Sequence, residues 1–595
     1  MSLRLAIICF FFLQFLGCCY SLPSPGPQCK TALSSEEWPS EVQWANLNRS
    51  ISGHLIKTTP PGAVCHPGQA SFNTTACISV QAGWKIASWH TNNPVSSLQN
   101  NWNNDTCLPD PTAPCSGDGY PIYVVNATSP EDVKEGIEFA GKHKIRLIVK
   151  GTGHDYLGRS SAPNSLSIWT HNLRGLVFHE GFQPKKCGIS IDGHAITAGA
   201  GTQMLELDEQ AHLRNLTIVS GGGGSVGVGG YLTGGGHAAL SSTYGMAAEQ
   251  VLEMEIVTPR GEIMTINECQ NTDLFWAMRG GGGSTFGAIT SVTIRAYPST
   301  KFLASVVSIS STPGTQDIWT AAARLLSQFP NLNAQGISCY LFIDHNAVPP
   351  VALNITTNVD IIYGTFFTSA FSPQNTSSTL YAALEDMVSK STSPFPQGQF
   401  QQVVQTPIVY DDFWGWYKFF NGPLNAGNDF LVGSRLFDEK ALTGNVTKLA
   451  ETLETVVEGS GNFRIFLVGR GGKSLRKVVP RGGDTPATGM WKNALAHGLY
   501  TMKFPPHDPV AKARVKDDVH NIYNKALRDL IPDMGAYINE ANPYEPDYQT
   551  TYWGDNYARL ARIKKEVDPD DVLWCSPCVG NEGWAEYGKG GLCRV

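Results

Sequence analysis

Ser-Gly-Gly-Gly-Gly-Ser-Val-Gly-Val-Gly-Gly-Tyr-Leu-Thr-Gly-Gly-Gly-His-Ala-Ala-Leu-Ser-Ser-Thr-Tyr-Gly-Met, residues 220–246, is the stretch that decides the fold. Ten of the seventeen residues from Ser220 to Gly236 are glycine. Ordering so unconstrained a backbone costs entropy, and its valines and Leu232 are not typical of a flexible polar linker. Glycine also lets main-chain N–H groups approach a ligand closely. The stretch therefore predicts backbone folded around a large, flat, partly anionic cofactor.

Two shorter glycine-rich loops lie in the same strand-rich part of the chain. Lys150-Gly-Thr-Gly-His-Asp-Tyr-Leu-Gly158 follows the predicted strand 145–149, and Gly280-Gly-Gly-Gly-Ser-Thr-Phe-Gly287 follows the predicted helix 274–279. A glycine-rich turn after a strand presents backbone N–H groups to anions. Three such loops suit a long cofactor that is contacted at several points.

The run also contains Gly222-x-Gly224-x-x-Gly227, which satisfies the dinucleotide-binding pattern, with Glu249 at the expected distance downstream. That pattern requires a strand before it and a helix that opens within it. Here the following residues are still rich in glycine, so a match to spaced glycines carries little weight. We therefore expect no Rossmann-type site.

Hydrophobic periodicity predicts an α+β fold in two main parts. Ser129, Pro130 and Asp132 predict the start of a helix in the first part. The second part alternates strands with longer helices and predicts an antiparallel sheet with helices on one face. The predicted limits are a signal peptide at 1–21, a disulfide-rich N-terminal extension at 22–116, a cofactor-binding domain at 117–300, a substrate domain at 301–529, a segment returning to the first domain at 530–579 and a tail at 580–595.

The N-terminus has the features of a secretory signal. Arg4 precedes an apolar run, and Cys19-Tyr20-Ser21 is a plausible cleavage site. Because the run is short for a bilayer span, we favour secretion over an uncleaved anchor. Glycans are expected on several of the sequons, which lie at Asn48, Asn73, Asn104, Asn126, Asn215, Asn354, Asn375 and Asn445.

Eleven cysteines remain after the predicted cleavage. Disulfides are expected in an oxidising compartment, for example Cys65–Cys77 or Cys107–Cys115, and the sequence does not determine the pairing. The odd number leaves at least one thiol unpaired or paired between chains. Cys575-x-x-Cys578 has no second pair and no histidines at ligand spacing, so no metal site is predicted. The net charge of −7 gives no electrostatic case for nucleic acid or a membrane surface.

Four motifs follow one another in an order and spacing known from one family. They are Gly151–Gly158, Ser225–His237 continued by Tyr244–Leu252, Phe275–Gly287, and Tyr537-Ile-Asn539 with Asn556–Lys564 before Asp568-Pro569. Together they resemble the vanillyl-alcohol-oxidase-type (PCMH-type) FAD-linked oxidoreductases, in particular the berberine-bridge-enzyme-like branch and its secreted fungal type. The resemblance covers roughly 120–300 and 530–575 and is weaker between them.

The resemblance implies FAD bound between the two halves of a PCMH-type domain, with His154 bonded to the 8α carbon of the flavin. The bicovalent members carry a cysteine where this chain has Gly223, so no second link is expected. His237 is expected to pack or hydrogen-bond near the ring. The cofactor-binding residues that this implies are Gly151, Thr152, Gly153, His154, Asp155, Gly158, Gly223, Gly224, Ser225, Gly227, Gly229, Gly230, Gly234, Gly235, His237, Tyr244, Val251, Gly287, Ile289, Tyr537 and Asn539.

The resemblance also implies an oxidase mechanism. A general base removes a proton from the substrate, a hydride passes to flavin N5, and O2 is reduced to H2O2. Tyr156 is expected to face a small alcohol, phenol, amine or sugar-like substrate, and the candidates for the base are His497 and Glu540. His497 lies in an alternating stretch, where a one-residue slip would turn it to the other face of a sheet. The alternatives are an enzyme of secondary metabolism that catalyses cyclisation or coupling without net oxidation, and a non-catalytic glycoprotein.

Overall fold

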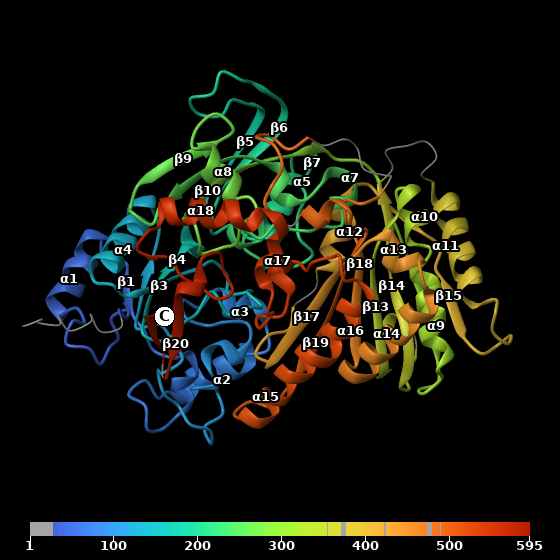
Figure 1. Ribbon diagram of the computed structural model, residues 1–595, viewed down its shortest axis with the longest axis horizontal. Helices are drawn as coiled ribbons and strands as arrows, with labels where there is room; N and C mark the ends of the chain where they lie inside the picture. The colour runs from blue at the N-terminus through green and yellow to red at the C-terminus, as the bar shows by residue number, and fades with distance from the viewer. Residues whose placement is uncertain are drawn as a thin grey trace, which may run out of the picture.

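The computed structural model describes residues 28–353, 355–369, 376–421, 424–472, 479–487, 489–588 and 590–595. The predicted signal peptide and the sequons at Asn354 and Asn375 lie outside these ranges. Within them every helix is too short or too polar to cross a bilayer. The fold is α+β, as predicted, with the helices and strands arranged around three main sheets (Figure 1).

The N-terminal segment packs against the body of the molecule and adds a strand to its first sheet. Helix α1 (Glu41–Ser50) begins at a capping box between Ser40 and Gln43. Strand β1 (Leu55–Lys57) then pairs antiparallel with β2 (Tyr123–Asn126). Two further helices, α2 (Thr74–Gly83) and α3 (Ala87–Thr91), complete the segment.

Five disulfides hold the chain together, and they include both pairs given as examples from the sequence. Cys29–Cys593 joins the two ends of the described chain, across 564 residues of sequence. Within the described residues the one free cysteine is the buried Cys339. The remaining bridges are Cys65–Cys77, Cys107–Cys115, Cys187–Cys269 and Cys575–Cys578.

The first sheet has the strand order β1-β2-β4-β3 and leads directly into the first glycine loop. Strands β3 (Arg146–Lys150) and β4 (Ser165–Trp169) pair in parallel, so a crossover must separate them. Helix α4 (Pro130–Lys142) packs on the sheet and begins at a capping box between Ser129 and Asp132, as predicted. Because β3 ends at Lys150, the loop 151–158 starts at the carboxyl edge of the sheet.

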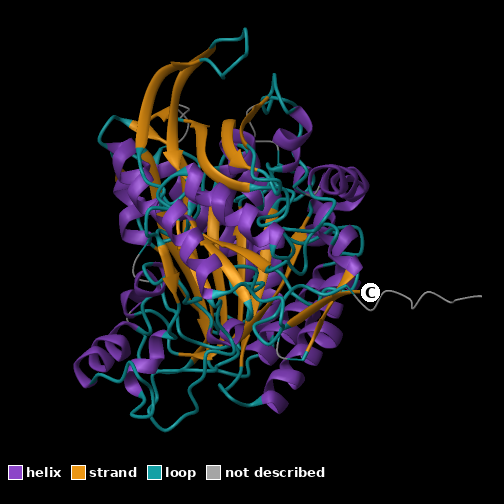
Figure 2. Ribbon diagram, turned by 90° about the vertical axis from the view of Figure 1, so that its left-hand side faces the viewer, coloured by secondary structure: helices purple, strands orange, loops and turns teal. Residues whose placement is uncertain are grey.

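The second sheet is antiparallel, with the order β5-β6-β10-β8-β9. Its β5–β6 hairpin projects from the top of the molecule in both ribbon views (Figures 1 and 2). Strand β6 lies between β5 and β10 and pairs antiparallel with both. The strands are β5 (Leu176–Phe182), β6 (Ile191–Gly199), β8 (Val251–Val257), β9 (Ile263–Asn267) and β10 (Ala288–Arg295).

The central glycine run connects these sheets and does contain a helix, contrary to the expectation. Helix α6 (Val228–Thr233) opens at Gly227 without a side-chain cap. The strand before the run, β7 (Leu216–Thr217), pairs only with β11 (Tyr297–Pro298), so the arrangement is not a strand–turn–helix unit within a parallel sheet. Nearby helices are α5 (Met204–His212), α7 (Ser241–Tyr244) and α8 (Thr272–Ala277).

The third sheet lies at the other end of the molecule and has the antiparallel order β15-β12-β14-β13-β18-β19-β17, with β16 also paired to β12. Helices α9 (Asp317–Leu326), α11 (Ser377–Thr392) and α14 (Val446–Ser460) share a hydrophobic core with it, as predicted for an antiparallel sheet covered by helices (Figure 1). The strands are β12 (Phe302–Ser311), β13 (Ser338–Ala347), β14 (Val359–Ser369), β15 (Gln401–Val404), β16 (Ile408–Tyr410), β17 (Phe430–Phe437), β18 (Asn462–Leu467) and β19 (Ala496–Lys503).

The C-terminal segment crosses back to the first two sheets. Leu573 forms a parallel bridge to Leu147 in β3, and α18 (Tyr557–Val567) lies beside α8 (Figure 1). Strands β20 (Trp584–Tyr587) and β21 (Gly591–Arg594) end the chain. The remaining helices are α10 (Phe329–Ala334), α12 (Phe413–Phe420), α13 (Glu439–Thr443), α15 (Pro509–Asp518), α16 (Asn524–Leu530) and α17 (Tyr548–Trp553).

Candidate functional site

A cavity of about 620 Å³ lies where the three glycine loops, the third sheet and the C-terminal segment meet. That volume is within the range of small-molecule and cofactor sites. One side is formed by the loop 151–156 and the central run, and the opposite side by β13, β18 and β19. Tyr537, Asn539 and Glu540 of the C-terminal segment line the cavity as well.

Glycines on the first side leave room for a ligand against bare backbone. A Cβ at Gly230 would meet no atom within 4 Å, and one at Gly151 or Gly229 would meet only a single atom, at 3.8 and 3.9 Å respectively. The packing of the protein itself therefore does not require a glycine at these three positions. Gly236 differs, because a Cβ there would lie 2.8 Å from Ala247 and its φ is +71°. Bare backbone beside an open cavity fits a bulky flat group such as FAD.

His154 lines the cavity at the end of the first loop. Its Nε2 lies 2.8 Å from the Ser225 hydroxyl of the central run, which leaves Nδ1 without a partner among the described residues. Burial, together with the charge of Lys150 and the nearby His90, lowers the pKa of His154 to about 3. The imidazole is therefore neutral at neutral pH.

Lys150 is buried immediately before this loop. Its Nζ donates a hydrogen bond to the Asn93 carbonyl at 2.8 Å, and burial lowers its pKa to about 7. Asn93 belongs to the N-terminal segment, so that segment holds the residue from which the loop 151–158 starts. The loop is also held from the other side, because Arg159 pairs with Asp155 and donates to the Asn539 side-chain oxygen at 2.9 Å.

A carboxylate between two histidines lies at the junction with the third sheet. Glu540 Oε2 accepts hydrogen bonds from His237 Nε2 at 3.1 Å and His497 Nε2 at 3.0 Å. Burial would raise the pKa of Glu540, but the hydrogen bonds and charges of the two imidazoles outweigh it and lower that pKa. Glu540 and His237 line the cavity, whereas His497 is fully buried behind them. The carboxylate is thus kept ionised at the cavity wall.

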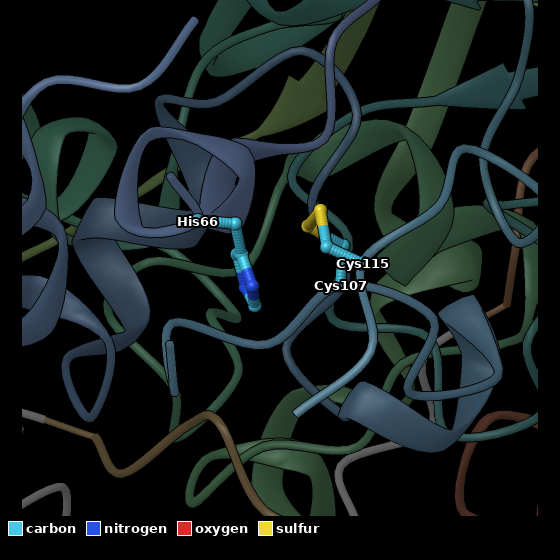
Figure 3. A group of neighbouring side chains, drawn as sticks. All are labelled: His66, Cys107 and Cys115. Atoms are coloured by element: carbon cyan, nitrogen blue, oxygen red, sulfur yellow. A yellow bond between two sulfur atoms is a disulfide. The ribbon is translucent and has the colours of Figure 1, made fainter. Parts of the chain in front are cut away.

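The same three ligand atoms all lie within 4.8 Å of one another and could in principle hold a metal ion. Metal-binding histidines almost always donate the other ring N–H to a second partner. The Nδ1 atoms of His237 and His497 are buried and have no such partner among the described residues. A second cluster, His66 with Cys107 and Cys115 (Figure 3), has its two sulfurs joined in a disulfide. His66 Nε2 bonds to the Leu108 carbonyl at 2.8 Å. At both clusters the geometry therefore favours hydrogen-bonded histidines over histidines that bind a metal ion.

Two tyrosines flank the Glu540 carboxylate. The Tyr537 hydroxyl accepts hydrogen bonds from the Gly236 N–H at 3.3 Å and from the Asn539 amide at 3.0 Å. Burial, with Glu540 nearby, raises the pKa of both Tyr537 and Tyr156, so both hydroxyls stay protonated. Tyr156 lines the cavity and its ring lies 5.8 Å from that of Phe430.

The structure brings together most of the residues singled out from the sequence, and some lie outside the cavity lining. Outside the lining, Ser225 is hydrogen-bonded to His154, and His497 is hydrogen-bonded to Glu540. Gly158 packs against Trp102, and the ring of Tyr244 stacks on that of Tyr297 with 3.9 Å between their centres. Gly224, Gly234, Gly235 and the buried Val251 also lie outside the lining. The lining contains Gly151, Thr152, Gly153, His154, Asp155, Tyr156, Gly223, Gly227, Gly229, Gly230, His237, Gly287, Ile289, Tyr537, Asn539 and Glu540.

Sequence reasoning missed a second set of lining residues, on the third sheet and beside the first loop. Arg159 follows Gly158 directly and pairs with Asp155 within the first loop, and because that loop is not helical, spacing alone gave no sign of the ion pair. Tyr340, Phe342, Arg464 and Phe466 project from paired strands that lie more than 100 residues apart in sequence. Their alternation was visible, but the pairing of their strands was not.

Comparison with known proteins agrees with this geometry. Residues 121–267 match the FAD binding domain family, and residues 536–579 match the berberine and berberine-like family. An uncharacterized FAD-linked oxidoreductase of Arthroderma benhamiae is 34% identical, with 98% of each chain covered. The VAO-type flavoprotein oxidase VAO615 of Thermothelomyces thermophilus is 32% identical over 96% of each chain. The crystal structure of the VAO-type flavoprotein MtVAO713 from Myceliophthora thermophila C1 superposes with a TM-score of 0.87, at 28% identity, covering 96% of this chain and 100% of that one.

Proposed function

Because the chain belongs to the VAO-type, berberine-bridge-like family of FAD-linked oxidoreductases, we propose that it is a secreted oxidase whose FAD is attached through His154. It oxidises a small alcohol, phenol, amine or sugar-like substrate and reduces O2 to H2O2. The observation that carries the proposal is the placement of His154 and Glu540 on the wall of one cavity, with bare glycine backbone beside the first and an ionised carboxylate at the second.

The glycine-lined side of the cavity is the proposed FAD site. The backbone of Gly151, Gly229 and Gly230 offers unobstructed contact, and the loop N–H groups would receive the pyrophosphate. Asn539 and Tyr537 fix the C-terminal segment against the central run, because the Asn539 amide donates to the Gly230 carbonyl at 3.0 Å. When bound there, FAD would accept a hydride from the substrate and pass two electrons to O2.

His154 is the proposed attachment residue. Its Nε2 is engaged by Ser225, so Nδ1 is the ring nitrogen that remains for a bond. The low pKa of His154, caused by burial and by Lys150, keeps the imidazole neutral at neutral pH, and in the tautomer that donates Nε2–H to the Ser225 hydroxyl the Nδ1 lone pair is available for the bond. Gly223 lines the cavity where the bicovalent relatives carry cysteine, so one link is proposed and not two.

Glu540 is the proposed general base, and His497 positions it. The side chain of Glu540 is 24% exposed and lies on the cavity wall, where Oε1 carries no hydrogen bond to the described chain. That oxygen can take the proton from a substrate hydroxyl as the hydride leaves the adjacent carbon. His237 and His497 hold Oε2, so the direction of the carboxylate is fixed by two donors.

Secretion and glycosylation are part of the proposal. Five disulfides are typical of an oxidising compartment. Asn73, Asn104, Asn215 and Asn445 are exposed. Asn73 and Asn445 cap helices through their side-chain oxygens, which leaves their amide nitrogens free for glycan attachment.

Anaerobic mixing with a panel of alcohols, phenols, amines and sugars tests the oxidase function. At least one member is expected to bleach the oxidised flavin absorbance with one substrate consumed per flavin. Admission of air is expected to restore the absorbance and to release one H2O2 per product. Product formation without bleaching, and without peroxide, would instead identify a cyclising or coupling enzyme. A preparation that binds no flavin would contradict both.

A further inference from the structure

The side of the cavity opposite the glycine loops is a regular patch of the third sheet. In the β13–β18 register Tyr340 lies opposite Phe466, and Phe342 lies opposite Arg464. Because alternate residues share one face of a strand, these four side chains form a two-by-two patch that faces the cavity. We call Tyr340, Phe342, Arg464 and Phe466 the sheet patch.

The sheet patch is mostly aromatic, and apart from Arg464 its one polar side-chain group is the Tyr340 hydroxyl. Tyr340 packs edge-on against Phe466 at 4.9 Å and stacks with Phe420 at 5.0 Å. Leu499 extends the same surface on β19, and the Thr501 hydroxyl already donates to Asn462. A sugar ring carries a hydroxyl on nearly every carbon, and most of these would lose their hydrogen bonds on this wall. A flat ring with apolar faces would lose none.

Arg464 is the exception, because it is paired with Asp344 and still has N–H donors to offer. Its Nη1 is bonded to Asp344 and to the Ile343 carbonyl, whereas its Nε and Nη2 find no acceptor among the described residues. The side chain is 25% exposed and its guanidinium lies 5.0 Å from the centre of the Phe342 ring. A guanidinium with free N–H groups binds a planar carboxylate well.

Neighbouring positions of the sheet carry Arg464 and the histidine that holds the proposed base. Phe466 lies opposite His497, which holds Glu540, and Arg464 is two residues away on the same face of β18. Two residues along a strand span about 7 Å. The backbone positions of Arg464 and of the residue opposite His497 are therefore about one benzene ring apart along the sheet.

We propose that the sheet patch selects a small aromatic or conjugated alcohol that carries a carboxylate opposite the reacting carbon. The ring lies against Phe342 and Phe466, the carboxylate binds Arg464, and the hydroxyl points to Glu540. This inference rests on the proposed oxidase function and assigns its substrate class.

Kinetics with matched alcohols test it. The probes are 4-(hydroxymethyl)benzoate, its methyl ester, and cellobiose. We expect kcat/KM for the acid to exceed that for the ester by about 10- to 100-fold, the usual advantage of a hydrogen bond to a charged group. Cellobiose should be the poorest of the three. Equal values for acid and ester, or a higher value for cellobiose, would overturn the proposal.

Variants of Arg464 and Phe466 test whether these side chains cause the preference for the acid over the ester. Arg464→Met should reduce the acid-to-ester ratio to near one, and Arg464→Lys, which keeps the charge but loses the planar fork, should give an intermediate ratio. Phe466→Leu should raise KM for both aromatic probes by more than it lowers kcat. Lys503→Met removes an exposed cation from the end of β19 and should leave the ratio unchanged. An unchanged ratio in Arg464→Met would overturn the role of Arg464.

Failure of this inference can be told apart from failure of the proposed function. If cellobiose or another sugar bleaches the flavin and the aromatic probes do not, the oxidase function stands and the substrate class is wrong. If no alcohol, phenol, amine or sugar bleaches it, the oxidase function itself is wrong.

Discussion

Replacing Glu540 by glutamine is expected to lower kcat/KM by about 10²- to 10⁴-fold, the usual contribution of a positioned general base. Glutamine has nearly the same shape but cannot accept the substrate proton, and one of the two histidines can still donate to its carbonyl oxygen. Flavin content and its visible spectrum should therefore stay close to those of the parent protein. Anaerobic flavin reduction by a saturating substrate measures the effect on the chemical step alone.

The pH dependence of the same reaction gives an independent readout. His237 and His497 lower the pKa of Glu540 below its ordinary value of 4.5. The base must be ionised to act, so kcat/KM of the parent protein should hold as the pH falls through 4.5 and decline only below it. The Glu540→Gln variant should lack that acid limb. Glu566→Gln, on the exposed side of α18, is the matched control. A loss of less than about tenfold in Glu540→Gln would exclude Glu540 as the base.

Replacing Lys564 by methionine is expected to destabilise the protein by about 3–5 kcal/mol, the cost of leaving one member of a buried ion pair alone. Lys564 Nζ is bonded to the Asp568 carboxylate at 2.5 Å and also donates to the carbonyls of Leu573 and Thr285. Both charged side chains are at most 5% exposed. The contact to Thr285 joins the C-terminal segment to the third glycine loop, so the loss should extend to the cofactor side of the cavity.

Lys565, the next residue of α18, is exposed and provides the control. The melting temperature of the flavin-loaded protein should fall clearly in Lys564→Met and remain near the parent value in Lys565→Met. Release of flavin fluorescence on heating should begin earlier in the first variant. Equal melting temperatures for the two variants would show that the buried pair does not fix the C-terminal segment.

The sequence predicted the parts of the fold that local chemistry determines. Helix α4 begins at Ser129 because a capping box and a proline at the first position act within four residues. The loops 151–158 and 280–287 could be predicted because each is rich in glycine and directly follows a predicted strand or helix. Residues of both loops line the cavity. The position of His497 beside Glu540 was not determined locally, because it depends on the register of β19 with β18.

Other parts depend on contacts between distant segments, which no local pattern contains. Strand β5 is half exposed and has no clear alternation, so only its pairing with β6 defines it. Helix α6 forms among glycines because the surrounding backbone supports it, although its propensity is low. Arg464 could not be assigned to the site, because its position depends on the pairing of β13 with β18.

The most direct test of the account is peptide mass spectrometry of the purified, protease-digested protein, with His154→Ala as the matched control. The account predicts one flavin on the peptide that contains His154, attached at the imidazole, with yellow colour that survives acid precipitation. In His154→Ala the corresponding peptide should be unmodified and any flavin should be released by acid. An unmodified His154 in correctly folded protein from flavin-replete cells would contradict it.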